Sequence, residues 1–213
     1  MSKHTLLMVG EVILAVIILG SIFIKITAKP PTDQTTAAVA SGDEMADHHK
    51  PKPADSSVFS ALLDQEAPDF TLSTFGGKNI RLADFKGKNV VLFFNEGLMC
   101  YPACWDQIAA FGQDGDFGKS NTVVLNITVD PKAQWERAVA QMPKLATATV
   151  LLDTDKSVST KYGVMSLDSS MHRGQFPGHT YVLIDKEGII RYLLDDPQMA
   201  VRNKQLLEEA AKL

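Results

Sequence analysis

The sequence predicts an α/β domain built around one central sheet. Apolar runs of strand length alternate with segments of helical periodicity from residue 67 to the C-terminus. Their order is a hairpin, then β-α-β-α-β-α, then β-β-α, and strands that alternate with helices pack as a sheet covered by helices. The only two cysteines, Cys100 and Cys104, stand directly after one of the predicted buried strands. This placement makes the end of that strand the first candidate for chemistry.

The first predicted elements are a hairpin, a buried strand and a helix. Residues 69–85 hold two short β-type runs around the turn sequence GGKN, a pattern typical of a hairpin. Residues 89–96 read NVVLFFNE, and a continuous apolar run of this length indicates a strand covered on both faces. The segment 102–114 then spaces Trp105 and Ile108 as an amphipathic helix does.

The second half of the domain continues this alternation and closes with a hairpin and a helix. Pro131 falls in the first turn of a predicted helix, where the N–H that proline lacks has no partner to lose. Gly163 ends a later, shorter helix. The elements are a strand at 121–130, a helix at 131–142, a strand at 149–153, a helix at 155–163, two strands within 179–195 around the turn sequence DKEG, and an amphipathic helix at 198–213.

The N-terminal part of the chain predicts a membrane anchor followed by a linker. Residues 6–26 are apolar and, at about 1.5 Å per residue, would cross a hydrocarbon core about 30 Å thick. Glu11 lies toward the N-terminal end of this segment, where its carboxylate can reach the headgroups. A cleaved signal peptide would want small residues just after the apolar run, and the AVA at 38–40 lies too far downstream. The expected parts are a tail at 1–5, an anchor at 6–26, a flexible linker at 27–57 and a folded domain at 58–213.

We expect a single-pass membrane protein whose folded domain lies outside the cytoplasm. A short N-terminal tail before a long C-terminal domain is the usual layout of a signal anchor. The charges do not decide the orientation, because Lys3 precedes the apolar run while Lys25 and Lys29 follow it. The linker is rich in Pro, Ala, Thr, Asp and Lys and is too poor in large apolar residues to fold.

Composition excludes several classes of function. The formal net charge is −4 and the sequence shows no basic stripe, so nucleic acid is not an expected partner. Two cysteines are too few for a disulfide framework or for a four-cysteine zinc site. Because the two lie close together, they are a redox pair, two metal ligands or a structural disulfide.

The sequence CYPAC at residues 100–104 permits a redox cycle. We expect a helix to begin near Tyr101 or Pro102, which puts Cys100 at its N-terminal edge, where the helix dipole and free N–H groups stabilise a thiolate. Cys104 follows four residues later, within reach of a disulfide. One cysteine can therefore attack a substrate and the other can resolve the product. Which of them attacks stays open, and a stable structural disulfide remains the alternative.

Four sequence blocks carry a resemblance to a known family. They are APDFTL at 67–72, LADFKGKNVVLFF at 82–94, LLDTDKSVSTKYGV at 151–164 and HTYVLIDKEGIIRY at 179–192. In this order they resemble the thioredoxin-like superfamily, and more closely its redoxin branch of the peroxiredoxin (AhpC/TSA) type. The resemblance covers residues 67–213 and implies a thioredoxin-like fold, with a central mixed sheet flanked by helices.

The resemblance also implies a function. It predicts a membrane-anchored thiol-disulfide oxidoreductase or thiol peroxidase whose catalytic residues, Cys100 and Cys104, cycle through an intramolecular disulfide. The expected substrate is a peroxide or a protein disulfide. The expected electron donor is a reducing thiol protein or a membrane oxidoreductase, and no cofactor is expected in this interpretation.

Three positions depart from the peroxiredoxin pattern. Peroxiredoxins resemble PxxxTxxC around the attacking cysteine, whereas Gly97 and Phe93 stand three and seven residues before the first cysteine here. Peroxiredoxins also carry an arginine just ahead of the strand that matches TYVLID, and His179 stands at that place. Arg173 or Arg191 would have to substitute for it. These departures favour a thiol-disulfide reductase over a fast peroxidase.

The alternative function is copper binding. The spacing CxxxC is similar to that of the Sco family of membrane-anchored copper chaperones, which also carry a distal histidine ahead of a late strand. Two thiolates and an imidazole suit copper, so His179, or His172, would be the third ligand beside Cys100 and Cys104. The order differs from the Sco pattern, because proline stands at position 102 and not at 101. The two hypotheses separate on whether His179 lies within ligand distance of both sulfurs.

Other residues near the cysteines have plainer interpretations. Glu96 and Asp106 flank the pair and could shuttle protons, or could be ordinary surface carboxylates. Trp105 and Trp135 are expected in the core or in the wall of a cleft. Met99 could be a soft metal ligand, although packing is the simpler expectation.

Overall fold

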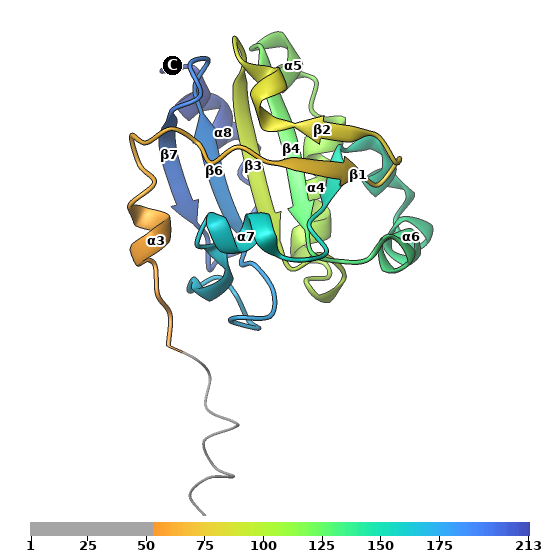
Figure 1. Cartoon of the computed structure of the whole chain (residues 1–213). Coiled ribbons are helices and arrows are strands. Elements are labelled where there is room, and N and C mark those ends of the chain that lie inside the picture. The colour runs from red at the N-terminus through yellow and green to blue at the C-terminus, as the bar shows by residue number, and fades with distance from the viewer. Residues whose placement is uncertain (1–52) are drawn as a thin grey trace, which may run out of the picture. The chain divides into compact units, whose positions relative to one another are not determined.

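The computed structural model describes residues 53–213, which Figure 1 draws as a coloured ribbon. The predicted tail at 1–5 and the predicted anchor at 6–26 lie outside the described residues, as does the predicted linker up to residue 52. Within the described part of the chain, none of the helices has the length and apolar character needed to span a bilayer.

A mixed seven-stranded sheet forms the centre of the domain (Figure 1). The strands are β1 (Thr71–Thr74), β2 (Asn79–Arg81), β3 (Asn89–Asn95), β4 (Thr122–Thr128), β5 (Val150–Leu152), β6 (Thr180–Ile184) and β7 (Ile190–Asp195). They lie in the order β2-β1-β5-β4-β3-β6-β7. The β3–β4 and β4–β5 pairs are parallel, and all other pairs are antiparallel. The predicted α/β domain with a mixed sheet, including both hairpins, is confirmed.

Helices cover both faces of this sheet (Figure 1). The α-helices are α3 (Ser57–Ser60), α4 (Ala103–Gln113), α5 (Asp116–Lys119), α6 (Lys132–Gln141), α7 (Ser157–Lys161) and α8 (Asn203–Ala210). The 3-10 helices are η1 (Leu82–Phe85), η2 (Gly97–Met99), η3 (Pro143–Thr147) and η4 (Val164–Ser166). Buried side chains of α4, α6 and α8 join one hydrophobic cluster, and those of α3 and α7 join the cluster on the opposite face.

Strand β3 is buried on both faces, as its apolar run predicts. All seven of its residues are buried. Val91 and Phe93 point into the cluster under α4 and α8, whereas Val90, Leu92 and Phe94 point into the opposite cluster. Because side chains alternate along a strand, one continuous apolar run supplies both cores. This strand is therefore the rigid element from which the following cysteine loop emerges.

The last helix begins later than the predicted 198–213. Helix α8 starts at Asn203, and residues 196–202 form a loop. Met199 in this loop has a φ of 49°, a left-handed conformation that an α-helix cannot contain. The predicted helix start at residue 198 was therefore five residues too early, although the apolar stripe continues correctly from Leu206 onward.

A buried carboxylate organises this loop. Asp196 accepts hydrogen bonds from the backbone N–H groups of Gln198 (3.2 Å) and Ala200 (3.1 Å). The guanidinium of Arg202 donates two further bonds to the same carboxylate, at 2.8 and 2.7 Å. The backbone N–H of Asp196 donates to the carbonyl of His179 at 3.0 Å. The loop is thus tied to the start of β6.

Segments that are distant in the sequence meet at one edge of the sheet. Strands β3 and β4 are parallel and end together, at Asn95 and Thr128. Strand β6 runs antiparallel to β3, so its first residue, Thr180, pairs beside the end of β3. The cysteine loop after β3 and the segment before β6 therefore lie at the same edge. In open α/β sheets, this carboxyl edge of the parallel strands is where sites form.

Asp153, directly after β5, supports this edge of the sheet and can be tested by substitution. Its buried carboxylate accepts hydrogen bonds from the N–H groups of Val158 (3.2 Å) and Ser159 (2.7 Å) at the start of α7 and from the Ser159 hydroxyl (2.7 Å). We expect Asp153→Ala to lower the free energy of unfolding by about 2–3 kcal/mol, because buried donors lose their acceptor. The exposed neighbour Asp155, which accepts from the Ser157 N–H, is the control and should cost less than about 1 kcal/mol as Asp155→Ala. Urea unfolding followed by tryptophan fluorescence measures both, and equal losses would contradict the assignment.

Candidate active site

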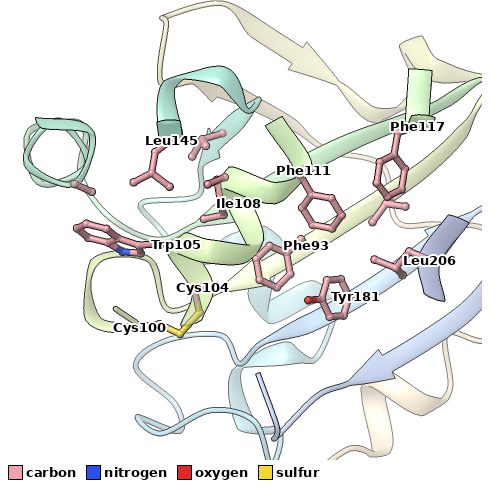
Figure 2. Close-up of a cluster of buried hydrophobic side chains, with 14 of the residues drawn as sticks. Phe93, Cys100, Cys104, Trp105, Ile108, Phe111, Phe117, Leu145, Tyr181 and Leu206 are labelled. Carbon is pink, nitrogen blue, oxygen red and sulfur yellow. A yellow bond between two sulfur atoms is a disulfide. The ribbon is translucent and has the colours of Figure 1, made fainter. Parts of the chain in front are cut away.

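The two cysteines form a disulfide at the edge of the sheet (Figure 2). Their Cα atoms are 5.3 Å apart, and the side chains are almost fully buried, with 2% of Cys100 and none of Cys104 exposed. Helix α4 begins at Ala103, after a cis peptide bond between Tyr101 and Pro102, so the predicted helix start was one or two residues early. Cys104, and not Cys100, lies in the first turn of α4. The helix dipole therefore acts most strongly on Cys104.

Four contacts fix the loop between β3 and the disulfide. The N–H of Gly97 donates to the Asn95 side chain at 2.9 Å, and the N–H of Leu98 donates to the Asp130 carboxylate at 2.7 Å. The indole N–H of Trp105 donates to the carbonyl of Gly97 at 3.0 Å. Asp130 also accepts a hydrogen bond from the Thr128 hydroxyl at 2.9 Å. Trp105 is therefore a core residue, which was one of its two expected positions, and its indole N–H holds the loop at Gly97.

Asp130 is the buried acidic group of this loop. Burial raises its pKa, while the hydrogen bonds from Leu98 and Thr128 work in the opposite direction. The carboxylate sits beneath Gly97, whose φ of 57° is in the left-handed region. A side chain at residue 97 would overlap the carboxylate of Asp130 and the hydroxyl of Thr128. Glycine is thus required both for the backbone conformation and for the space that Asp130 occupies.

His179 lies against the second cysteine. Its Nδ1 is 3.5 Å from the Sγ of Cys104, and its Nε2 is 2.7 Å from the hydroxyl of Tyr181. The ring is fully buried and stands edge-on to Phe93, with centroids 4.6 Å apart. Burial lowers the pKa of His179 to about 4, although the charge of Asp196 opposes this shift. The imidazole is therefore neutral at physiological pH and can offer a lone pair.

Met199 is a sulfur neighbour that sequence reasoning missed. Its Sδ lies 4.0 Å from the Sγ of Cys100, although the two residues are far apart in the sequence. Met99, which the sequence suggested as a soft ligand or a packing residue, is instead 52% exposed. No local pattern could have found Met199, because it sits inside a segment that reads as the start of a helix.

Glu96 is buried and does not behave as a surface carboxylate. It accepts hydrogen bonds from the backbone N–H groups of Met171 (2.6 Å) and His172 (3.1 Å) and from the Ser170 hydroxyl (3.2 Å). The Nδ1 of His172 lies 2.9 Å from its second oxygen. His172 is thus engaged with Glu96, which leaves His179 as the histidine at the disulfide. Asp106, by contrast, is exposed, as the plainer expectation had it.

The two arginines that the sequence offered as substitutes are engaged elsewhere. Arg191 pairs with Asp185 at 2.7 Å and with Asp64 at 3.0 Å. Arg173 donates to the carbonyl of Leu167 at 3.1 Å. Within residues 53–213, therefore, the imidazole is the nitrogen group found in contact with the disulfide. The ligand atoms of Cys100, Cys104 and His179 all lie within 4.8 Å of one another. His179 is therefore close enough to both sulfurs that the copper alternative stays open.

The family assignment comes from comparison with known proteins. Residues 63–193 match the model of the AhpC/TSA family. The chain belongs to this family. Members of the AhpC/TSA family are peroxiredoxins, which are thiol-dependent peroxidases, so the prediction of a thiol-dependent enzyme is confirmed. The match spans the disulfide, the loop before it and the β6–β7 hairpin.

Individual peroxiredoxins show how far the similarity reaches. Peroxiredoxin-2 of Mus musculus is 32% identical over 149 residues, which cover 63% of this chain and 69% of that protein. The putative peroxiredoxin bcp of Coxiella burnetii is 35% identical over 134 residues, covering 62% of this chain and 86% of the relative. The crystal structure of the reduced 2-Cys peroxiredoxin of Plasmodium vivax superposes with a TM-score of 0.59 at 24% identity, covering 70% of this chain and 80% of that one. The structural match confirms the thioredoxin-like fold.

Gly97 offers a test of the loop in this AhpC/TSA protein. We expect Gly97→Ala to destabilise the chain by about 1–2 kcal/mol for the left-handed backbone and by a further 1–3 kcal/mol, roughly, for the overlap with Asp130. Gly77, with a φ of 86° and open space around it, is the matched control, and Gly77→Ala should show the backbone term alone. Thermal unfolding of both variants measures the difference. Similar losses of unfolding free energy in the two variants would mean that the Asp130 side chain moves aside at no cost.

Proposed function

We propose that this chain is a dithiol peroxidase in which Cys100 attacks and Cys104 resolves. The observation that carries the proposal is the Cys100–Cys104 disulfide packed against the neutral imidazole of His179. Cys100 lies in the loop that reaches the surface, next to Tyr101, which is 65% exposed. Cys104 lies in the first turn of α4 and has no exposed surface. The first step is therefore assigned to Cys100, the residue in the loop.

The proposed cycle has two steps. The Cys100 thiolate attacks one oxygen of a peroxide, which leaves a sulfenic acid on Cys100 and releases a hydroxide or an alkoxide. Cys104 then attacks the sulfenic sulfur, the S–O bond breaks, and water leaves as the disulfide forms. The sulfurs already occupy positions that a disulfide requires, so the second step needs no large movement of the loop.

A thiol protein is the proposed electron donor. Four exposed apolar side chains belong to the cysteine loop or to segments that contact its surroundings. Met99 and Tyr101 flank Cys100 in the sequence, the N–H of Met171 binds Glu96, and Val201 follows two residues after Met199. Apolar groups exposed beside a reactive centre fit a protein partner better than a small thiol alone. Protein disulfides are accordingly a second proposed substrate, since the same exchange runs in either direction. The predicted anchor at 6–26 would hold this domain at a membrane, on the extracytoplasmic side, and would make a membrane oxidoreductase a further possible donor.

Thiol counting tests the cycle. We expect the reduced chain to lose both thiols for each molecule of hydrogen peroxide consumed, with an intramolecular disulfide as the product. Cys100→Ser should abolish peroxide consumption, whereas Cys104→Ser should stop at a sulfenic acid that a dimedone-type reagent traps on Cys100. Peroxide consumption by Cys100→Ser, with none by Cys104→Ser, would reverse the roles. No consumption by the wild-type chain, together with rapid reduction of a protein disulfide, would favour the reductase.

Copper binding is a second candidate, favoured by a specific observation. In the reduced state the two thiolates of Cys100 and Cys104 and the Nδ1 of His179 are donors within a small volume, since their ligand atoms lie within 4.8 Å of one another. The thioether of Met199, 4.0 Å from the Cys100 sulfur, adds a fourth soft donor. Thiolate and thioether ligands select monovalent copper, so the residues present fit that ion.

Competition with a coloured Cu(I) chelator tests this candidate. We expect the reduced chain to bind one Cu(I), and His179→Ala to weaken the affinity by more than about tenfold, since losing even the partner of a ligand costs roughly 10–100-fold. Met199→Leu should weaken binding by less, and Met99→Leu, which alters an exposed thioether, is the control. Binding that is no tighter than that of a Cys100→Ser variant would exclude a dedicated copper site.

A further inference from the structure

A line of hydrogen-bonded side chains crosses the domain from Cys104 to Asp114. Beyond His179, the Tyr181 hydroxyl lies 2.9 Å from the Oε1 of Gln107, and both residues are fully buried. The Nε2 of Gln107 lies 2.8 Å from the Oδ1 of Asn203. The Nδ2 of Asn203 lies 2.9 Å from the Oδ2 of Asp114, near the surface. The line therefore joins β6, α4 and α8.

Two groups that cannot be reversed set the direction of every bond in this line. The carboxylate of Asp114 only accepts, so Asn203 must present its NH₂ group to it and its oxygen to Gln107. The backbone N–H of Arg202 only donates, and it lies 2.7 Å from the Oε1 of Gln107. Gln107 is consequently held with its oxygen toward Arg202 and Tyr181 and its NH₂ toward Asn203. Turning the amide over would place donors against donors.

This direction fixes the tautomer of His179. The Oε1 of Gln107 at 2.9 Å and the Ala200 carbonyl at 3.4 Å both accept, so the single proton of the Tyr181 hydroxyl is donated to these oxygens and not to His179. A phenol has an ordinary pKa of about 10, so Tyr181 keeps that proton at neutral pH. The Nε2 of His179, 2.7 Å from the same hydroxyl, must then carry a proton and donate it. The Nδ1 is left with a lone pair, and it is this nitrogen that faces the sulfur of Cys104.

We propose that Tyr181 and Gln107 are positioning residues that hold His179 in the Nε2–H tautomer, so that its Nδ1 receives the proton of the Cys104 thiol. This inference rests on the proposed dithiol cycle and deepens it. His179 is the catalytic base, because it touches a reacting atom. In this assignment the base deprotonates Cys104, the resolving cysteine, and does not act on Cys100.

The step balances without an additional reactant. The Cys104 thiol transfers its proton to Nδ1 of His179, and the resulting thiolate attacks the sulfenic sulfur of Cys100. The S–S bond forms as the S–O bond breaks, and the departing hydroxide takes the proton from Nδ1 as water. His179 ends in the neutral state in which it began, with its Nε2 proton still donated to Tyr181.

The loop before α8 keeps the line closed. The paired charges of Asp196 and Arg202 hold the backbone N–H of Arg202 on Gln107, and the N–H of Asp196 binds the carbonyl of His179. The same loop therefore fixes both His179 and Gln107 within the line. A rigid support of this kind is what a positioned base requires.

Tyrosine substitution combined with nitrogen NMR tests the proposal. In the wild-type chain, we expect the ¹⁵N shifts of His179 to show an unprotonated Nδ1 and a protonated Nε2. In Tyr181→Phe the two tautomers should mix, and disulfide formation from the Cys100 sulfenic acid should slow by about tenfold, the loss of one hydrogen bond to a reacting base. Formation of the sulfenic acid itself should not change. The signals are assigned by comparison with His179→Asn, and stopped-flow tryptophan fluorescence follows both steps.

Tyr192→Phe is the matched control. Tyr192, on β7, accepts a hydrogen bond from the side chain of Gln205 at 2.8 Å and takes no part in the line. Loss of the Tyr192 hydroxyl should therefore leave the tautomer of His179 and the rates of sulfenic acid and disulfide formation unchanged. Gln107→Leu should have a smaller effect than Tyr181→Phe, because the Ala200 carbonyl at 3.4 Å still accepts from the Tyr181 hydroxyl. A protonated Nδ1 in the wild-type chain would overturn the proposal, even if a variant failed to fold. Unchanged disulfide formation in folded Tyr181→Phe would also overturn it.

Failure of the peroxidase proposal would look different. If the wild-type chain formed no sulfenic acid with peroxide, the experiment would be repeated with glutathione disulfide as the substrate. Attack by Cys100 on that substrate gives a mixed disulfide, which Cys104 resolves. Attack by Cys100 releases one glutathione and resolution by Cys104 releases the second. A tenfold slower release of the second glutathione from Tyr181→Phe than from Tyr192→Phe would support the base assignment while the peroxidase is abandoned. Equal release rates would overturn the assignment.

Discussion

A neutral imidazole buried against a sulfur atom is the interaction on which the rest of the candidate site depends. His179 is fully buried, and both of its ring nitrogens need partners there. Cys104 faces one nitrogen and Tyr181 faces the other. The Tyr181 hydroxyl then needs an acceptor, which Gln107 supplies from the inner face of α4. Each buried polar group requires the next, until the line comes close to solvent at Asp114.

The loop before α8 follows from the same requirement. A helix that began at residue 198 would direct the N–H of Arg202 to the carbonyl of Gln198, and Gln107 would lose a donor. With the helix starting at Asn203, that N–H is free to bind Gln107. The left-handed turn at Met199 accomplishes this and also brings a thioether to the disulfide. The departure from helical periodicity is thus part of the site.

The fold could be predicted because its signals are local. The run at 89–96 has the length and composition of a strand covered on both faces, and the segment 102–114 has one apolar stripe. The cysteine pair was also visible, because Cys100 and Cys104 are close in the sequence. Tyr181 and Gln107 were not, because a tyrosine in a strand and a glutamine in a helix give no sign of burial. Only tertiary packing tells a buried polar residue from a surface one.

In the proposed cycle, the departures from the peroxiredoxin pattern change which step the protein assists. The family threonine would fall at Gly97, where the backbone is left-handed and Asp130 fills the space of a side chain, so no hydroxyl can stand there. The family arginine would fall at His179, and a neutral imidazole cannot stabilise the attacking thiolate as a fixed cation does. It can accept a proton, and it lies against Cys104. In the proposed cycle, assistance therefore moves from attack by the first cysteine to resolution by the second, which is the step that a protein exchanging disulfides with a partner also needs.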